Sequence, residues 1–576
     1  MKRVISGQSV SKGIGMGHVH LYQRYNPIKK LSYIAVDDIN ATLDRYREIV
    51  QKTHKEIDDI RIFLQKNDHE KANIFLAHLE ILHDIALEDS IIKHIKEDHY
   101  ALSYAIHEAF DSFITMINQI KNEYLRERVV DLIDVRNRIL RIEEGLPENN
   151  LPFIKKPVVL VAEDLLPSDT ASLHREHIEA ILTESGGVTS HTAIIAKSYE
   201  IPAILGIKDL FNTIKQDTYV IVDALLGVII IDPDEQTKKD YQKKKREYLD
   251  KQSEVETYLP FVPMTTDGVH VKVNLNMNGF LKEELSSEPF VDGVGLFRSE
   301  FLYMDKECLP TEEEQLDIYT HVLKTFGDKP VILRTLDIGA DKKLPYLDLP
   351  HEENPYLGYR AIRFSMGNPE IFKTQLRAAY RASIYGNLWL MFPMVSSMDD
   401  IENISRFIEE VKSSLKIQNI PFREDVKIGV MMEIPSLILI SDHVAKVVDF
   451  ASIGTNDLCQ YLTAVDRHNP LVASYYQSFS PAMFRIIKMA VDAFDKANKP
   501  ISICGELSSD PRAVPILLGL GIRHLSMTKS AVPHIKKIIT SHSMSDFIDA
   551  AQNTLELSRE KDIIEYIHAH FSIDIL

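Results

Sequence analysis

The sequence predicts a multidomain α/β protein in which an all-helical segment and a small α/β unit are followed by a (β/α)8 barrel. Three observations carry this prediction. Residues 28–144 contain neither glycine nor proline, although average usage would place about 14 of them there. Strand-like apolar runs ended by turn residues occupy 157–233, and from residue 262 onward such runs alternate with helical patterns. The chain has 576 residues, enough for several domains.

Composition narrows the class of protein. The 84 acidic residues outnumber the 66 basic ones and give a net charge of −18, which disfavours binding to the phosphate backbone of nucleic acids. The only cysteines are Cys308, Cys459 and Cys504, and three cannot form a disulfide framework. The first residues lack an apolar segment and no stretch of 18 apolar residues occurs, so we expect no membrane insertion. We expect a soluble, cytoplasmic protein.

The segment 28–144 has the apolar spacing of helices. Its first seam steps by threes and fours through Leu43, Tyr46, Val50, Thr53, Ile57, Ile60 and Leu64. Such spacing puts these side chains on one face of a helix. We therefore predict an all-helical hairpin or bundle.

The next stretch reads as a small α/β unit. Strands are predicted in PVVLVAEDL (157–165), IEAILTESGG (178–187) and YVIVDALLGVIIIDP (219–233), with the strand-like opening VISGQSVSKGIGMGHVHL joining them across the helical segment. Between the strands, TSHTAIIAKSYE reads as a helix opened by a Ser or Thr cap, with Thr189 and Thr192 as cap candidates. The charged residues 234–258 read as a linker helix.

The last part of the chain supplies the barrel strands. They are VKVNLNM (271–277), VGLF (294–297), VILR (331–334), LWLMF (388–392), KIGVMME (427–433), FASIG (450–454), ISIC (501–504) and HLSM (524–527). Polar or ionisable residues stand at their C-terminal ends: Arg298, Arg334, Glu433, Asn456, Asp457 and Cys504. Because barrel enzymes build their active sites on that face, we predict an active site there.

The residue types indicate the chemistry of this predicted site. Arginine binds carboxylate or phosphate through paired hydrogen bonds, and two carboxylates with open positions suit Mg²⁺. A small phosphorylated carboxylic acid would satisfy the whole set. A structural ion-pair network at the barrel rim is the alternative. Cys504 is either a proton donor or a buried, inert thiol.

His191 is a second candidate, in GGVTSHTAII. A Gly-Gly turn and hydroxyl residues precede a predicted helix N-terminus, which would offer N–H groups to a phosphoryl group. A neutral imidazole is a competent nucleophile; a surface or satisfied core histidine is the alternative. No GxxxxGK[ST] loop occurs, so a Walker-type nucleotide site is not expected, and no Cys/His cluster has zinc spacing.

Over essentially its whole length the sequence resembles enzyme I of the bacterial phosphoenolpyruvate:sugar phosphotransferase system. The motif GGVTSHTAIIAKSYEIPAILG resembles the phosphohistidine signature of that family. Further matching motifs are GVGLFRSEFLYMD, VILRTLDIGADKK, ENPYLGYRAIR, MMEIPS, SIGTNDLCQYLTAVDR and CGELSSD. Departures from the usual pattern are Lys197, Tyr359, Ala451 and Cys459, and none removes a chemical group needed for the reaction.

The resemblance implies roles for individual residues. His191 would be phosphorylated by phosphoenolpyruvate with release of pyruvate, and Cys504 would be the proton donor. Glu433 and Asp457 would bind Mg²⁺. Arg298, Arg334 and Arg467 would hold the substrate's phosphate and carboxylate, Asn456 and the backbone of Asp457 would contact the phosphate, and Arg360 would be a further contact.

The resemblance also implies a domain organisation, with a separate function for each domain. Residues 1–27 and 145–233 would form a swivelling phosphohistidine domain, and the inserted helices of 28–144 would bind the histidine phosphocarrier HPr. Residues 234–261 would be a linker helix, and 262–576 the barrel that binds phosphoenolpyruvate and forms a homodimer. The phosphoryl group would pass from His191 to HPr, for sugar uptake, regulation or both.

Three other interpretations compete with this one. A pyruvate-phosphate dikinase or phosphoenolpyruvate synthase would need a nucleotide-binding domain, which 28–144 does not resemble. A signalling hub would use the same chemistry with other acceptors. A catalytically dead scaffold is disfavoured because every matched reactive group is present.

Overall fold

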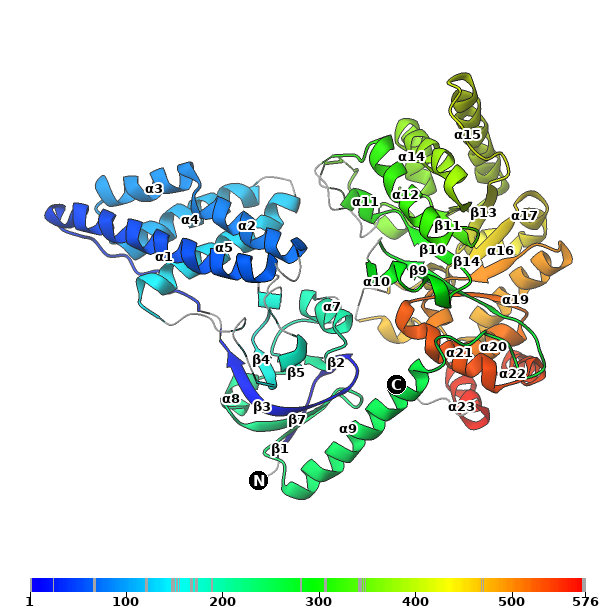
Figure 1. The fold of residues 1–576 in the computed structure, drawn as a ribbon, viewed down its shortest axis with the longest axis horizontal. Coiled ribbons are helices and arrows are strands. Elements are labelled where there is room, and N and C mark those ends of the chain that lie inside the picture. The colour runs from blue at the N-terminus through cyan, green and yellow to red at the C-terminus, as the bar shows by residue number, and fades with distance from the viewer. Residues whose placement is uncertain are drawn as a thin grey trace. The chain divides into compact units, whose positions relative to one another are not determined.

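The computed structural model of the chain describes residues 3–23, 25–65, 69–119, 123–146, 151, 154, 156–165, 169–170, 173, 175–187, 190–279, 282–304, 308–339, 344, 346–347, 349–467, 469 and 471–571. These form two compact units, residues 1–250 and 251–575 (Figure 1). Within the described residues, no helix combines the length and the apolar character that a membrane span requires.

The first unit contains an eight-stranded sheet with the order β1-β8-β7-β3-β4-β5-β6-β2. The strands are β1 Arg3–Ser6, β2 Gln8–Ser11, β3 Ile14–Tyr22, β4 Val158–Ala162, β5 Ile178–Thr183, β6 Ala203–Leu205, β7 Tyr219–Asp223 and β8 Val228–Ile231. Strands β3, β4, β5 and β6 pair in parallel. The predicted joining of the opening strands to the later ones is confirmed, because β3 pairs with both β4 and β7.

Two details of this sheet differ from the prediction. The run 219–233 is not one strand: β7 and β8 pair antiparallel, and Gly227, at φ +69°, lies in the turn between them. Glycine adopts that conformation without strain. The short strand β6 was missed, because three residues are too few to show a period. Helices α7 His191–Ser198 and α8 Leu210–Thr213 complete the fold around the sheet.

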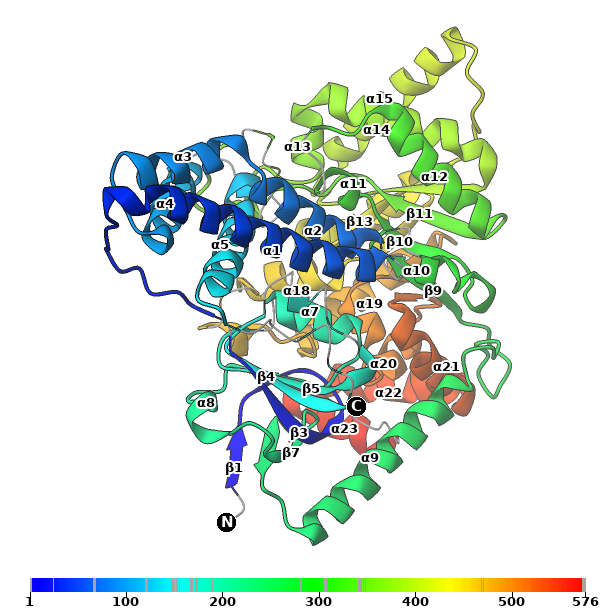
Figure 2. The same cartoon turned by 60° about the vertical axis from the view of Figure 1, so that its left-hand side comes forward.

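The chain between β3 and β4 in the sequence forms five described helices, which gather into one bundle (Figure 1 and Figure 2). They are α1 Ile39–Gln65, α2 His69–Leu82, α3 Ile85–Lys96, α4 Leu102–Gln119 and α5 Glu123–Glu143. The seam predicted for α1 is correct where its side chains are described: Leu43, Tyr46, Ile57 and Ile60 are buried in one core with residues of the other helices. Thr53 is fully buried and bonds the carbonyl of Ile49.

Helix α9, Glu235–Glu256, follows the sheet and spans the boundary between the two units. Its earlier part is held to the sheet by ion pairs. Lys244 contacts the buried Asp223 at 2.6 Å, and Lys245 contacts Glu179 at 2.5 Å. Because both pairs join α9 to strand residues, the helix is fixed to the sheet at least as far as Lys245.

The second unit is the closed barrel that the sequence predicts. Its strands run in the order β10-β11-β12-β13-β14-β15-β16-β9 and every pairing is parallel. They are β9 Lys272–Met277, β10 Val294–Arg298, β11 Pro330–Arg334, β12 Asn387–Phe392, β13 Lys427–Met432, β14 Phe450–Ile453, β15 Ile501–Ile503 and β16 His524–Met527. Each of the eight predicted barrel strands is therefore present.

Helices cover the outside of the barrel. They are α10 Lys282–Leu285, α11 Phe301–Met304, α12 Glu312–Phe326, α13 Ile362–Gly367, α14 Pro369–Ala382, α15 Met398–Ile417, α16 Pro435–Leu439, α17 Ser441–Val447, α18 Thr455–Thr463, α19 Pro481–Lys496, α20 Val514–Gly519, α21 Val532–Ser541, α22 Met544–Glu556 and α23 Glu560–His570. Capping boxes start three of the longer ones, as at Thr311 and Glu314 of α12. Such boxes satisfy N–H groups that a helix start leaves unpaired.

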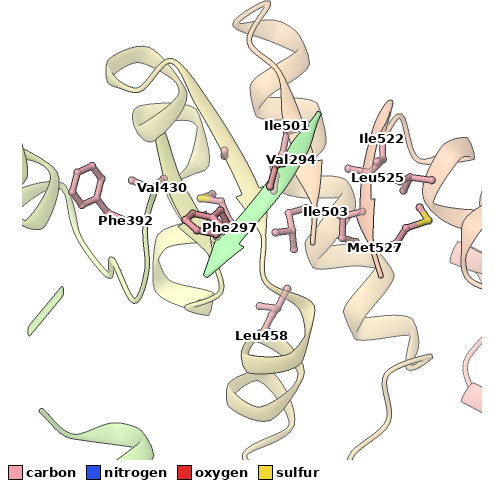
Figure 3. Close-up of a cluster of buried hydrophobic side chains, with 14 of the residues drawn as sticks. Val294, Phe297, Phe392, Val430, Leu458, Ile501, Ile503, Ile522, Leu525 and Met527 are labelled. Carbon is pink, nitrogen blue, oxygen red and sulfur yellow. The ribbon is translucent and has the colours of Figure 1, made fainter. Parts of the chain in front are cut away.

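Two apolar layers result from the alternation of side chains along the barrel strands. Val430, Ile503 and Leu525 belong to the large outer core between strands and helices, part of which Figure 3 shows. The interior layer consists of Leu296, Ile332, Met391, Met431, Phe450 and Cys504. This layer fills the middle of the barrel, and polar groups of the carboxyl ends lie beyond it.

Candidate active site

The predicted barrel residues meet at one end of the barrel. Arg298 and Arg334 are the last residues of the neighbouring strands β10 and β11 and pair in register. Glu433 follows β13 directly and Cys504 follows β15, while Asn456 and Asp457 lie in the first turn of α18, after β14. Because all eight strands are parallel, these positions share the carboxyl end.

Arg334 is buried beside two carboxylates. Its Nη2 donates to Oε1 of Glu300 at 2.5 Å, and its Nη1 lies 3.4 Å from Oδ2 of Asp337. Burial by itself would lower the pKa of Arg334, but the charges of Glu300, Asp337 and Glu433 outweigh it and raise that pKa. The guanidinium is therefore held firmly as a cation.

Arg298 has a different environment. Its Nη1 donates to Oδ1 of Asn278 at 2.6 Å. Burial, followed by the charge of Arg334, lowers the pKa of Arg298. The Nε atoms of both Arg298 and Arg334 are buried and have no hydrogen-bond partner in the described part of the chain. Two neighbouring guanidinium groups, each with a buried and unsatisfied Nε–H, form a site suited to an anion.

Arg360 forms hydrogen bonds to two carboxylates of the mouth, those of Asp337 and Asp457. Its Nη2 donates to both oxygens of Asp337 at 3.1 Å, and its Nη1 donates to Oδ1 of Asp457 at 3.4 Å and to the hydroxyl of Tyr461 at 3.2 Å. Arg467 lies at the rim, with Nη1 at 3.8 Å from Oδ1 of Asp457. Arg360 is 3% exposed, so in this structure it acts as a fixed bridge between carboxylates.

Glu433 is the most perturbed carboxyl group of the mouth. It is 2% exposed, and its Oε1 accepts a 2.6 Å hydrogen bond from the amide of Met394. Burial, followed by the charges of Asp457 and Asp337, raises the pKa of Glu433 to about 8. Glu433 and Asp457 therefore repel one another, and a cation between them would relieve that repulsion.

The carboxylates of Glu433 and Asp457 suit a Mg²⁺ ion that also takes ligands from its substrate and from water. No group of three or more His, Cys, Asp or Glu side chains with the arrangement of a metal site is found within the described residues. Mg²⁺ is commonly held by only one or two carboxylates together with substrate phosphate and water. Glu433 and Asp457 therefore match a cation that binds with its substrate.

Cys504 directly follows β15 and is close enough to Arg334 and Arg298 for their charges to affect its pKa. It is 3% exposed, and its Sγ–H donates weakly to the carbonyl of Ile453 at 3.7 Å. Burial raises the pKa of Cys504 to about 11, although Ser452, Arg334 and Arg298 partly oppose this. The group is therefore a thiol at neutral pH and holds a proton that it can donate.

Three residues that the sequence prediction missed support the mouth. Glu300 and Asp337 hold Arg334 and Arg360, and Asn276 donates from Nδ2 to the carbonyl of Cys504 at 3.0 Å. Glu300 follows Arg298 by two positions and Asp337 follows Arg334 by three. An acidic residue two or three positions after an arginine at a strand end was therefore the sequence signal that could have identified Glu300 and Asp337 as supporting residues.

Asn456 is fixed by backbone contacts. Its Oδ1 accepts from the amide of Glu506 at 2.9 Å, and its carbonyl accepts from the hydroxyl of Tyr476 at 3.1 Å. The side-chain amide group is thus oriented by the loop after β15.

His191 belongs to the first unit, whereas the barrel residues belong to the second. It is the first residue of α7, and the cap is Ser190, whose Oγ accepts from the amide of Ala193 at 3.2 Å. Thr192 was wrongly predicted as a cap: it is buried inside the helix, with its Oγ1 3.2 Å from Oδ1 of Asp164. Thr189 lies outside the described residues.

Comparison with known proteins identifies relatives along the entire chain. Residues 6–128, 154–227 and 252–544 match three families described as the N-terminal, mobile and PEP-binding domains of PEP-utilising enzymes. A phosphoenolpyruvate-protein phosphotransferase of Priestia megaterium is 40% identical over 574 residues and covers 100% of both chains. Its counterpart in Bacillus subtilis (strain 168) is 39% identical, covering 98% of this chain and 99% of that protein.

One solved structure, titled as an NMR solution structure of Enzyme I (nEIt) protein, is also similar. It is 36% identical, covers 42% of this chain and 99% of that chain, and has a TM-score of 0.40.

Proposed function

The chain belongs to the phosphoenolpyruvate-protein phosphotransferase family, and on that premise we propose that it transfers the phosphoryl group of phosphoenolpyruvate to its own His191 and then to a histidine of the carrier HPr. The observation that carries the first half is the pair of guanidinium groups of Arg298 and Arg334, each with a buried Nε–H that lacks an acceptor among the described residues. A substrate with a phosphate and a carboxylate supplies those acceptors.

The arginines would bind the substrate's anionic groups at the barrel mouth. Arg298 and Arg334 would take the phosphate and carboxylate, with Arg467 at the rim and Asn456 contributing its amide. Arg360 and the backbone of Asp457 would complete the contacts. Fixed positive charge that is already in place neutralises the transferring phosphoryl group without reorganisation of the protein.

Glu433 and Asp457 would hold Mg²⁺. Bound there, the ion would neutralise charge on the phosphoryl oxygens. The raised pKa of Glu433, caused by burial and by the charges of Asp457 and Asp337, supports this assignment, because a bound cation would favour the ionised carboxyl.

His191 would attack phosphorus in line through Nε2. The new N–P bond forms as the bond from phosphorus to the enol oxygen breaks, and the enolate of pyruvate keeps the electron pair. Cys504, a thiol at neutral pH because burial raises its pKa to about 11, would then give its proton to the methylene carbon. Pyruvate leaves, and the thiolate regains a proton from solvent.

His191 must meet two partners, the barrel and the carrier. We propose that the sheet domain swivels on the linker, while the helices of 28–144 dock HPr. Because α9 is fixed to the sheet by Lys244 and Lys245, the movement would occur C-terminal to Lys245. We further propose a cytoplasmic homodimer that associates through the barrel.

Intact mass spectrometry tests the proposal directly. Incubation with phosphoenolpyruvate and Mg²⁺ should add one acid-labile phosphoryl group and release one pyruvate, as expected for phosphohistidine. Labelling by ATP and phosphate, with none from phosphoenolpyruvate, would instead indicate the dikinase reaction. No labelling by either would contradict any phosphotransfer role.

Two variants locate the phosphorylated residue. His191→Ala should abolish labelling, whereas His177→Ala, in the same α/β unit, should retain it. Labelled His191→Ala protein would overturn the assignment of the nucleophile.

A further inference from the structure

The barrel interior contains a cavity at the end opposite the arginines. Its volume is about 260 Å³, and its lining includes Lys272, Asn387, Phe450 and His524, each the first residue of a barrel strand. First residues of parallel strands mark the amino end of the barrel, away from Arg298 and Arg334. The cavity is therefore distinct from the mouth described above.

Aromatic rings form one wall of this cavity. Trp389 and Phe450 line it, with ring centroids 4.9 Å apart and planes inclined at 52°. Gly429 on the neighbouring strand leaves room for the Phe450 ring, because a Cβ there would lie 2.6 Å from the ring carbons. The two rings therefore offer apolar and aromatic surface to a ligand ring, which can pack against either of them offset or edge-on.

The polar side chains of Asn274 and Ser502 line the same space. Asn274 is 5% exposed and lines the cavity. Its side-chain amide, which offers both a donor and an acceptor, has no hydrogen-bond partner among the described residues. Ser502 donates to the carbonyl of Ala451 at 3.3 Å, which leaves its oxygen lone pairs available.

His524 adds a neutral ring to this set. Burial, followed by the charge of Lys272, lowers the pKa of His524 to about 4. At neutral pH its imidazole therefore has one N–H donor and one acceptor nitrogen. The lining also includes the exposed Lys272 and Asp328, and Lys427 lies behind the aromatic wall with its Nζ 4.2 Å from the Trp389 ring centroid.

We propose that this cavity binds a small planar heterocycle of nucleobase size whose edge carries both hydrogen-bond donors and acceptors. The volume is below the 300–1,000 Å³ range of pockets for drug-sized ligands, so a compound of one or two rings fits best. An Asn side chain can pair with the edge of adenine through two hydrogen bonds. The side-chain amide of Asn274 would form hydrogen bonds with that edge, and Ser502 and His524 would be further hydrogen-bond partners.

The cavity is one layer of side chains away from the mouth. Trp389 packs against the interior layer that contains Phe450 and Cys504. A bound heterocycle would therefore contact side chains that also support the proton-donor position.

The chain supplies its own reporter, because Trp389 is its only tryptophan. Adenine titrated into the full-length protein should give a saturable change in tryptophan emission, excited at wavelengths that adenine does not absorb. Ribose 5-phosphate, which has no aromatic ring, should give none. An absence of any saturable change with adenine, or equal binding of ribose 5-phosphate, would overturn the proposal.

Variants assign the signal to the cavity. Asn274→Leu, of similar size, should raise the apparent Kd for adenine about fivefold or more, the factor expected for loss of one neutral hydrogen bond. Ser502→Ala provides a second cavity variant should Asn274→Leu fail to fold, and Asn553→Ala on the surface of α22 is the matched control. An unchanged Kd in a folded cavity variant would contradict the proposal.

One further variant separates the two ends of the barrel. Arg298→Met should bind adenine as the unmodified chain does, because Arg298 is at the mouth. Loss of adenine binding in Arg298→Met would place the ligand at the mouth and overturn the second site, whatever the outcome for phosphotransfer.

Discussion

Arg298 and Arg334 end adjacent barrel strands in register, and each buries an Nε–H that no described residue accepts. The two positive charges repel one another. Burial lowers the pKa of Arg298 most, and the charge of Arg334 lowers it further. The arrangement is thus unfavourable for the empty barrel and favourable for an anion.

Arg298→Met should therefore separate stability from activity. We expect the unfolding free energy of the barrel unit to rise by about 1 kcal/mol, because an unsatisfied buried donor and a repelling charge are removed. The kcat/KM for phosphoenolpyruvate should fall about 100- to 1,000-fold through loss of transition-state charge stabilisation. Thermal unfolding and a pyruvate-release assay measure the two effects. Destabilisation together with retained activity would contradict this view of Arg298.

Glu300→Gln should weaken substrate binding through Arg334. The substitution keeps the size of the side chain but removes the charge that faces Nη2 of Arg334 at 2.5 Å. We expect the KM for phosphoenolpyruvate to rise about tenfold, equivalent to about 1.4 kcal/mol. Glu312→Gln is the matched control, because Glu312 pairs with Arg377 and Arg381 away from the mouth. Equal effects in both variants would mean that Glu300 has only a structural role.

Cys504→Ala should slow pyruvate formation by about 100- to 10,000-fold, the range for loss of a general acid, while the barrel folds and binds substrate. Cys459→Ala is the control, because Cys459 is also buried, with its pKa likewise raised to about 11, mainly by burial. Stopped-flow measurement of pyruvate release distinguishes the two thiols. Equal rates in the two variants would remove the proton-donor role from Cys504.

His524 should make the barrel less stable in mild acid. Its pKa in the folded chain is about 4, below the ordinary 6.5, through burial and then Lys272 and His270, with Asp292 opposing. As pH falls from about 6.5 toward 4 the unfolded chain takes up the proton first, so stability is lost, at most about 1.4 kcal/mol per pH unit.

Urea unfolding at pH 7 and pH 5 measures this loss. The unmodified chain should lose more stability between these values than His524→Gln does. Identical losses would show that His524 titrates normally in the folded barrel.

The barrel and most of its mouth could be predicted from the sequence. Each strand is a short apolar run, and parallel geometry alone carries Arg298, Arg334 and Cys504 to one end. The ion pairs and hydrogen bonds that hold those side chains in place could not be predicted in the same way. Glu300 and Arg334 lie 34 positions apart, and their pairing depends on barrel closure.

The small α/β unit shows the same limit at shorter range. The turn at Gly227 is hidden within a continuous apolar run, and β6 has three residues. Thr192 has the residue type of a cap, yet its hydroxyl lies near Asp164. At these positions tertiary contacts determine the local structure and override the conformational preference of the individual residues.

The pairing of β3 with β4 and β7 has a consequence for synthesis of the chain. Strand β3 ends at Tyr22, and its first partner begins only at Val158. At ribosomal rates of about 5–20 residues per second, β3 waits on the order of 7–30 seconds for that partner. During that interval the nascent chain carries an unpaired strand, which folding helpers or an early collapse of the helices must keep from aggregation.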